Sequence, residues 1–235
     1  MMLLDIDVPS IESFRPGQWV DFVAKPNKWV GGFSIASSPR DLPRITLAVK
    51  KSKDIPATWI HDDDQCSEGG SVEIRVGGDS VLDERLPLRP SIFCAGGIGV
   101  SPILSQYREF LFLRDSINDA NSETATPSSM FLYTASSSQE LVFGSELAEL
   151  SRKGSELGCD KMVFALTKET SGISSDIPPH VERRTGRVLT EFLNEAPDDA
   201  NYYICGPPSM IDDAVHHLTG VRSIPQEQIY YEKWW

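Results

Sequence analysis

The feature that most limits the fold of this chain is a glycine-rich turn, G-G-I-G-V-S, that lies between an apolar run and a helical pattern. The apolar run covers residues 91–95, the turn covers 96–101, and the helical pattern continues to residue 113. A strand that ends in a tight turn at a helix N-terminus brings backbone N–H groups close to a pyrophosphate, whose charge the helix dipole favours. The residues expected to bind a dinucleotide there are Gly96, Gly97, Ile98, Gly99, Val100 and Ser101. An ordinary strand–helix connection has the same appearance, so this turn by itself leaves both interpretations open.

A second glycine turn near the C-terminal end follows another short strand pattern. Cys205, Gly206 and Pro207 come at the end of the pattern over residues 200–205. Two glycine turns that each follow a strand agree with one another, and that agreement favours a nucleotide site over an ordinary connection.

The pattern of strands and helices divides the chain into two parts. Residues 1–88 have strand patterns at 18–24, 32–37, 44–50 and 71–76, with a short helical pattern at 55–61. Residues 89–235 alternate strands with helices, which predicts a parallel sheet with helices on its faces. The strands expected there are 91–95, 130–135, 161–167, 200–205 and 228–231, and the helices are 101–113, 144–153, 190–194 and 207–218. The proline-bracketed segment 86–90 marks the boundary, and the polar segment 115–129 predicts a flexible loop.

The composition argues against several classes of function. The formal net charge is -12 and the pI is about 4.8, which disfavours contact with nucleic acid or with an anionic membrane. The longest apolar run, around residues 91–104, is interrupted by glycine and is too short to span a bilayer. The four cysteines form no C-x-x-C pair and the four histidines form no cluster, so we expect no metal site and no iron–sulfur cluster.

Motifs in both parts together resemble the ferredoxin–NADP reductase superfamily over nearly the whole chain. They are P-G-Q-W-V at 16–20, F-S-I-A-S at 33–37, A-T-W-I-H at 57–61, the two glycine turns, and Y-E-K-W-W at 231–235. The segment V-G-G-F-S at 30–34 and the E-K-W-W end resemble more closely a mitochondrial branch of that superfamily in animals. The resemblance implies an antiparallel flavin-type β-barrel over residues 1–88, whose first strand would lie before Leu3, followed by an α/β parallel-sheet nucleotide-binding domain over 89–235.

The resemblance also implies roles for individual residues. The implied catalytic residues are Ser34 near flavin N5, Cys205 at the nicotinamide, and Glu232 in the wall over the flavin. The implied cofactor-binding residues outside the first glycine turn are Phe33, Thr58, Gly206, Pro207 and Trp235. Three of these residues have a structural alternative: Ser34 is then a solvent-facing strand serine, Cys205 a small buried side chain, and Trp235 the apolar anchor of a chain end.

The chain departs from the superfamily pattern where the flavin phosphate binds. Three residues before the motif serine the family usually has Arg, and this chain has Gly31; the usual Tyr beside the serine is Phe33. The loss of a charge-assisted phosphate contact lowers affinity by roughly tenfold to a hundredfold. The basic residues that could compensate are Lys25, Lys28, Arg40 and Lys50.

The segment T-A-S-S-S-Q-E at 134–140 bears on the choice of coenzyme. It contains no Arg or Lys for a 2′-phosphate, and Glu140 would repel one. The sequence therefore favours NADH over NADPH.

Together these observations predict an oxidoreductase that passes a hydride from NADH to bound FAD, and then electrons to a separate acceptor such as a protein. The alternative is a nicotinamide-binding regulatory protein that has lost flavin and turnover. We expect a monomer without a nucleic-acid partner and without a membrane span. The resemblance implies a mitochondrial location, although the start of the sequence shows no leader.

Overall fold

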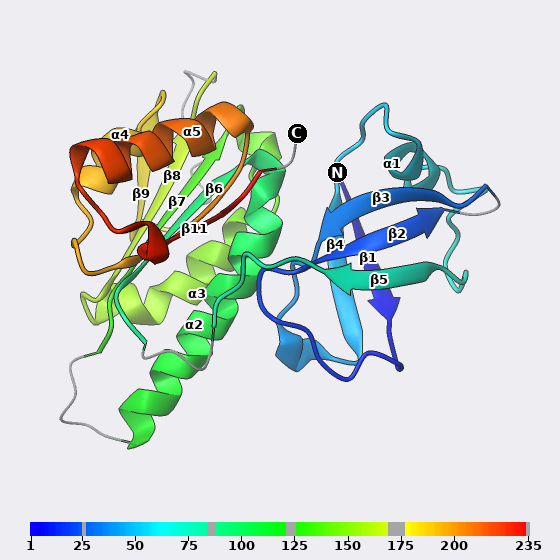
Figure 1. The fold of residues 1–235 in the computed structure, drawn as a ribbon, viewed down its shortest axis with the longest axis horizontal. Coiled ribbons are helices and arrows are strands. Elements are labelled where there is room, and N and C mark those ends of the chain that lie inside the picture. The colour runs from blue at the N-terminus through cyan, green and yellow to red at the C-terminus, as the bar shows by residue number, and fades with distance from the viewer. Residues whose placement is uncertain (25–26, 84–87, 121–125, 169–176, 234–235) are drawn as a thin grey trace.

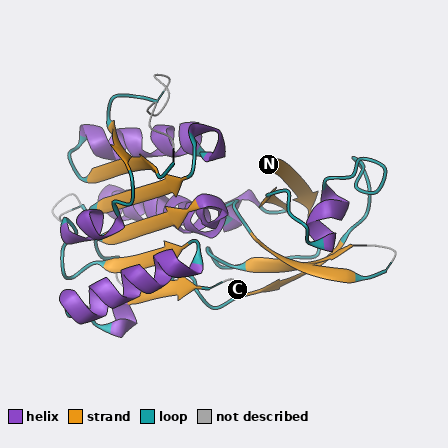
Figure 2. Ribbon diagram, turned by 90° about the horizontal axis from the view of Figure 1, so that it is seen from above, coloured by secondary structure: helices purple, strands orange, loops and turns teal. Residues whose placement is uncertain are grey.

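The computed structural model describes residues 1–24, 27–83, 88–120, 126–168 and 177–233. A β part (residues 1–83) and an α/β part (residues 88–233) lie side by side (Figure 1). Seen from above, helices cover both faces of the larger sheet (Figure 2). The predicted two-part architecture is confirmed.

In the β part, five strands form two small antiparallel sheets around one apolar core. The strands are β1 (Met2–Asp7), β2 (Trp19–Ala24), β3 (Trp29–Ser34), β4 (Arg44–Val49) and β5 (Glu73–Gly77). β1 pairs with β4, and β2 lies between β3 and β5. Alternate residues of β2 are buried, and the ring of Phe22 lies 5.8 Å from that of Trp59 on α1 (Ile55–Ile60). The period of two in β2 therefore fixes which face meets the core.

Two edge strands are absent from the sequence prediction. β1 is held to β4 by cross-strand polar pairs: Asp5 accepts from Thr46 at 2.6 Å, and Asp7 accepts from Arg44 at 3.0 Å. β9 (Val181–Thr185) buries only its first residue fully. β9 lacks the apolar alternation on which strand prediction relies. β1 does alternate, with Met2, Leu4 and Ile6 packed against the core, and its omission from the prediction was wrong. The expected strand at 32–37 also lies earlier, at Trp29–Ser34.

In the α/β part, six parallel strands form one sheet in the order β11–β10–β6–β7–β8–β9. The remaining strands are β6 (Ser91–Gly96), β7 (Ser129–Ala135), β8 (Asp160–Leu166), β10 (Asn201–Cys205) and β11 (Ile229–Glu232). The helices of this part are α2 (Val100–Ala120), α3 (Gly144–Glu156), α4 (Leu189–Asn194) and α5 (Pro208–His216). Short 3-10 helices lie at Gly97–Gly99, Ser138–Glu140 and Gln226–Gln228, with a further one at Pro39–Asp41 in the β part. A π-helical turn follows α5 at His217–Val221.

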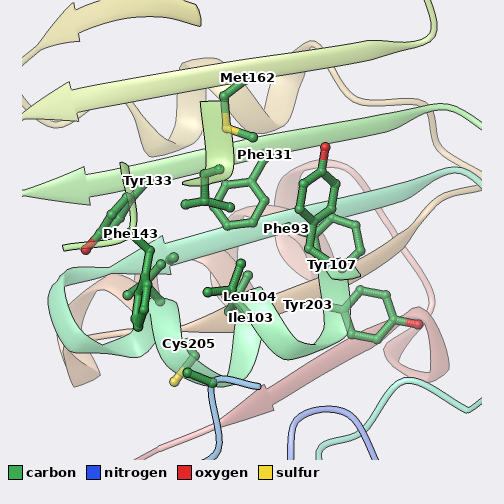
Figure 3. Packing of buried hydrophobic residues seen from close by; sticks show 14 of the residues in the cluster. Phe93, Ile103, Leu104, Tyr107, Phe131, Tyr133, Phe143, Met162, Tyr203 and Cys205 are labelled. Atoms are coloured by element: carbon green, nitrogen blue, oxygen red, sulfur yellow. The ribbon is translucent and has the colours of Figure 1, made fainter. Parts of the chain in front are cut away.

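The core of the α/β part has two layers, one on each face of the sheet. On the α2–α3 face the rings of Phe93 and Tyr203 stack with centroids 5.3 Å apart, and Figure 3 shows them beside Phe131 and Tyr107. On the other face the alternate residues of the same strands meet α4 and α5. Because both faces are covered, the central strands β6, β7 and β10 are largely apolar, as expected for a parallel sheet, whereas the edge strand β9 is polar.

Helix α2 is longer than predicted. The prediction of a flexible loop over 115–129 is wrong for residues 115–120, which continue this helix, and 121–125 lie outside the described residues. Arg114 donates to both carboxylate oxygens of Asp160, and the two side chains are 4% and 1% exposed. This buried ion pair fastens the helix to β8 just before the polar segment. A prediction from apolar periodicity cannot detect an ion pair of this kind.

Contacts between the two parts converge on α2. Three of its side chains donate to backbone carbonyl groups of the β part: Ser105 to Ser37 at 2.7 Å, Gln106 to Ser80 at 3.0 Å, and Arg108 to Ala36 at 3.0 Å. One turn on, the buried carboxylate of Glu109 accepts from two nitrogens of Arg40. The predicted boundary between residues 88 and 89 adjoins 84–87, which the structure does not describe, and it stays a prediction.

Candidate functional site

The two glycine turns meet at the carboxyl ends of neighbouring strands. β6 and β10 lie side by side in register, and the strand order reverses between them because β7 follows β6 on one side and β11 follows β10 on the other. In open α/β sheets, ligands bind outside the carboxyl ends of the strands at such a switch point. A Cβ added to Gly206 would lie 3.1 Å from Cα of Gly96, so the turns are in backbone contact.

Two glycines of the first turn serve different purposes. Gly97 has a φ of +55°, a left-handed conformation, and a Cβ there would meet nothing within 4 Å. Gly99 lies against the second turn: a Cβ would stand 2.6 Å from the carbonyl carbon of Cys205 and 2.8 Å from N of Gly206. Gly97 therefore shapes the turn and leaves open space, whereas Gly99 allows one turn to press against the other.

Ser101 stands in the first turn of the 21-residue helix α2 with an unpaired hydroxyl. The residue is 1% exposed, and its Oγ has no hydrogen-bond partner among the described residues. Buried hydroxyls normally find a partner, and an anion bound at this helix N-terminus would supply one. The neighbouring Val100 is fully buried and Ile98 is 38% exposed, so these two predicted contacts face different surroundings.

The predicted residues Cys205 and Glu232 are neighbours in the sheet. They are register partners at the ends of β10 and β11. Burial raises the pKa of the Cys205 thiol to about 12, with a smaller contribution from the charge of Glu232, so the thiol is neutral at physiological pH. Figure 3 shows Cys205 at the rim of the aromatic core. A neutral, 4% exposed thiol fits a residue that shapes a pocket and does not act as a base.

Trp19 connects this pair to the β part. Its indole Nε1 donates to Oε1 of Glu232 at 2.8 Å, while Oε2 of the same carboxylate is buried and has no partner within the described chain. Burial raises the pKa of Glu232, the hydrogen bond from Trp19 lowers it by less, and the charge of Asp79 adds to the rise. The indole itself lies against Gly77 and Gly78. The carboxylate is therefore oriented from across the interface.

Ser34 belongs to the same neighbourhood. It lies directly opposite Trp19 in the pairing of β3 with β2, and opposite residues project from the same face of a sheet. Cys205 and Glu232 are thus adjacent, Trp19 contacts Glu232, and Ser34 is the register partner of Trp19. Sequence analysis did not assign Trp19, although it quoted the residue within P-G-Q-W-V.

The remaining predicted cofactor contacts lie away from Cys205 and Glu232 or outside the described residues. Phe33 is turned to the core, where its ring makes an edge contact with Phe22 at 6.0 Å. Thr58 is exposed on α1, and its hydroxyl donates to the carbonyl of Ser52 at 3.3 Å. Pro207 is exposed at the start of α5, and Trp235 lies outside the described residues.

Lysine 50 reaches the coenzyme segment from the β part. Its Nζ lies 2.9 Å from Oε1 of Glu140, and Oε2 of Glu140 accepts from the backbone N of Ser136 at 3.2 Å. The hydrogen bond from Lys50 is the largest cause of a lowered pKa at Glu140. Sequence analysis found no base in the segment because this one comes from another part of the chain.

The described residues fit the two cofactors unequally. A nicotinamide dinucleotide fits the paired glycine turns and the orphan hydroxyl of Ser101. Ser34 and the unpaired oxygen of Glu232 are polar groups that a flavin ring would contact if it bound there. The flavin phosphate has less support, because the position where the superfamily usually has an arginine is Gly31, where a Cβ would stand 2.8 Å from Cβ of Pro56. In the described part of the chain, no group of three or more metal-ligating side chains gathers, and no helix is long and apolar enough to span a membrane.

Comparison with known proteins gives a consistent picture. A model of the oxidoreductase NAD-binding domain matches residues 93–216, just over half of the chain. The chain is 36% identical to oxidoreductase NAD-binding domain-containing protein 1 of Pongo abelii over 231 residues, which cover 95% of this chain and 71% of that protein.

Solved structures show the same fold. The cytochrome P450 reductase of Amycolatopsis superposes with a TM-score of 0.73 at 20% identity, over 98% of this chain and 64% of that one. The ferredoxin NADP+ reductase of Neisseria gonorrhoeae, solved with bound FAD and NADP, gives a TM-score of 0.69 at 17% identity, over 98% and 91%.

Proposed function

This chain belongs to the oxidoreductase NAD-binding domain family, within the ferredoxin–NADP reductase superfamily, and on that basis we propose that it is an NADH-dependent oxidoreductase that passes a hydride to a flavin. The superfamily resemblance noted in the sequence is thereby confirmed. The observation that carries the proposal is the buried, unpaired hydroxyl of Ser101 at the point where the two glycine turns meet.

The dinucleotide would lie across the carboxyl ends of β6 and β10. The open space at Gly97 lets the pyrophosphate approach the backbone, and Ser101 Oγ together with the first N–H groups of α2 would donate to it. The contact between Gly99 and Cys205 fixes the distance between the two turns. The nicotinamide would then reach the end of β10, where the neutral thiol of Cys205 limits how the ring can lie.

At the reacting end, the residues of this chain orient groups and hold a proton. Trp19 fixes one oxygen of Glu232, and the other oxygen is left for a ligand. The raised pKa of Glu232 increases the fraction of its neutral form, which can donate a hydrogen bond to a ring nitrogen. Ser34 would supply a hydroxyl from the β part. A flavin bound there supplies the redox chemistry, because it accepts a hydride and passes its electrons on to a separate acceptor.

The preference for NADH rests on Glu140. Its carboxylate stands just after β7 and is held by Lys50 and by the backbone of Ser136. A carboxylate near this place favours a ribose hydroxyl over a 2′-phosphate. Because Lys50 offsets part of that charge, we expect a preference of a few-fold rather than an absolute one.

Titration of the purified chain with NADH and NADPH, followed by nucleotide fluorescence, tests the proposal. We expect NADH to bind and to be oxidised without oxygen only when a flavin is added. Absence of NADH binding by the folded chain would contradict it.

A second candidate function is a nicotinamide-binding regulatory protein without turnover. The observation that favours it is the closed phosphate region around Gly31 and Pro56. It predicts NADH binding without oxidation in the presence of any flavin, so the same titration separates the two. A protein electron acceptor, a monomeric state and a mitochondrial location stay parts of the first proposal.

A further inference from the structure

The place where relatives would hold a flavin phosphate is filled in this chain. A Cβ at Gly31 would stand 2.8 Å from Cβ and 3.0 Å from Cγ of Pro56, and 3.2 Å from the ring of Phe33. Pro56 is buried in the first turn of α1. An arginine at position 31 therefore has no room unless α1 moves, so its absence is built into the packing.

The start of α1 also lacks the donors that a phosphate needs. Pro56 has no N–H group. The residue before the helix is Asp54, whose exposed carboxylate accepts from the hydroxyl of Ser52 at 3.0 Å and caps no helical N–H. The hydroxyl of Thr58 is already directed to the carbonyl of Ser52. A phosphate placed here would meet a negative charge and few donors.

Two of the basic side chains that could meet a phosphate are already paired with carboxylates. Lys50 is bound to Glu140, and Arg40 is bound to the buried Glu109. The exposed side of α1 borders an open depression in which one lysine faces three carboxylates; its lining residues are Lys51, Thr58, His61, Asp62, Asp63 and Asp64. The local charge is therefore negative, which disfavours a phosphate dianion.

The residues expected at the ring end of the flavin differ in charge from those at the phosphate end. Ser34 and the free oxygen of Glu232 offer polar contacts to an uncharged ring system, and Trp19 holds that oxygen in place. Nothing in these contacts calls for a charged ligand.

We propose that this chain recognises a flavin by its isoalloxazine ring and ribityl chain, and takes a phosphate-free flavin of the riboflavin class as an exchangeable substrate. The reaction in this inference rests on the proposed function, whereas the binding of the flavin does not. In the reaction, the C4–H bond of NADH breaks with its electron pair and a bond to flavin N5 forms; a proton from solvent completes the reduced flavin at N1, and NAD+ leaves. Both products then dissociate.

The test compares riboflavin, FMN and FAD as ligands of the full chain by quenching of flavin fluorescence at low ionic strength. We expect riboflavin to bind about tenfold more tightly than FMN, and the gap to shrink in 1 M salt because the repulsion is screened. FMN or FAD that binds more than tenfold more tightly than riboflavin, or that stays bound through desalting, would overturn the proposal.

Variants of single residues test whether the start of α1 causes the weaker binding of FMN. Asp54→Asn removes the charge at the start of α1 and should strengthen FMN binding about threefold without changing riboflavin binding. The matched control is Glu191→Gln, which removes an exposed carboxylate from α4 and should change neither. Equal effects of the two variants on FMN would contradict the proposal. The double variant Gly31→Arg/Pro56→Ala, where it folds, should gain FMN affinity about tenfold.

The same titrations separate this inference from the proposed function. If NADH binds and none of the three flavins does, the inference is overturned and nucleotide binding stands. If riboflavin binds with the expected preference but does not speed NADH oxidation, recognition stands and the proposed reaction fails.

Discussion

Glycine occurs at key motif positions in both parts of the molecule, and it means opposite things there. In the α/β part, the neighbours of a Cβ at Gly99 would be the backbone of Cys205 and Gly206, so glycine lets two backbone turns meet. In the β part, the neighbour of a Cβ at Gly31 would be the side chain of Pro56. The first glycine allows the two turns of the proposed nucleotide site to touch, and the second allows a proline to pack against a strand.

The comparison teaches that a missing motif residue is best judged by which atoms occupy the place of its side chain. A missing arginine over open solvent could be replaced by a lysine from elsewhere. A missing arginine whose place is taken by a buried proline is a different case, because a side chain restored there would have to displace the proline. The following predictions test how far the two parts differ.

The largest expected effect is that of Gly99→Ala. The added methyl group would press on the carbonyl of Cys205, which belongs to the backbone and cannot turn away, so we expect a loss of about 3 kcal/mol in stability and at least about tenfold in NADH affinity. Gly31→Ala should destabilise the fold by about 1–2 kcal/mol and leave NADH affinity unchanged. Thermal melts and NADH titration measure both. Equal losses of NADH affinity in the two variants would show that the two glycines do not differ in this way.

The next effect is that of Ser101→Ala. Removal of a buried hydroxyl without a partner should leave the thermal stability of the free protein unchanged or slightly higher, because an unsatisfied polar group is no longer buried. NADH affinity should fall about tenfold, since a phosphate contact is lost. A fall in stability with unchanged affinity would mean that the hydroxyl serves the fold.

A smaller effect is expected from the pH dependence of Glu232. Because its pKa is raised in the folded state, the unfolded chain binds fewer protons between the ordinary carboxyl pKa and the raised one, and stability falls as pH rises through that window. Glu232→Gln should remove this fall, and Trp19→Phe should deepen it, because the indole N–H lowers the pKa. The carboxylate is half-buried, so the effect should stay below about 1 kcal/mol, or at most roughly 3 °C in melts between pH 4 and 8. Parallel pH profiles for the three proteins would show that the contact across the interface does not tune this carboxyl.

The smallest expected effect concerns the coenzyme. Glu140→Gln should raise the affinity for NADPH a few-fold and change that for NADH little, because Lys50 is then left to meet a 2′-phosphate. Competition between the two nucleotides measures the ratio. An unchanged ratio would show that Glu140 has only a structural role.

Much of the α/β part was predictable because its signals are local. Apolar runs over 91–95 and 161–167 and the glycine turns give the order of strands and helices directly. The extension of α2 was not predictable, since it depends on the pairing of Arg114 with Asp160, two residues far apart in the sequence. The edge strand β9 escaped prediction because it buries little apolar surface, whereas β1 alternates apolar and acidic residues and could have been predicted.

The candidate site divides in the same way. The residues of the turns could be named from the sequence because each turn is a contiguous motif. The roles of Trp19 and Lys50 could not, because their partners, Glu232 and Glu140, are 213 and 90 residues away along the chain. The packing of Pro56 against Gly31 is a similar case: the sequence shows the missing arginine but not what replaced it.

Helix α2 contacts both parts of the molecule, so the two parts cannot be separated without the loss of those contacts. Its first turn carries Ser101, and the turns that follow bind the β part, ending at the buried carboxylate of Glu109. A fragment beginning at residue 89 would lose Arg40 and expose Glu109 to water, together with the groups of Ser105, Gln106 and Arg108 that donate to the β part. The two halves therefore share one seam along α2, and a change of sequence there in one half calls for a matching change in the other.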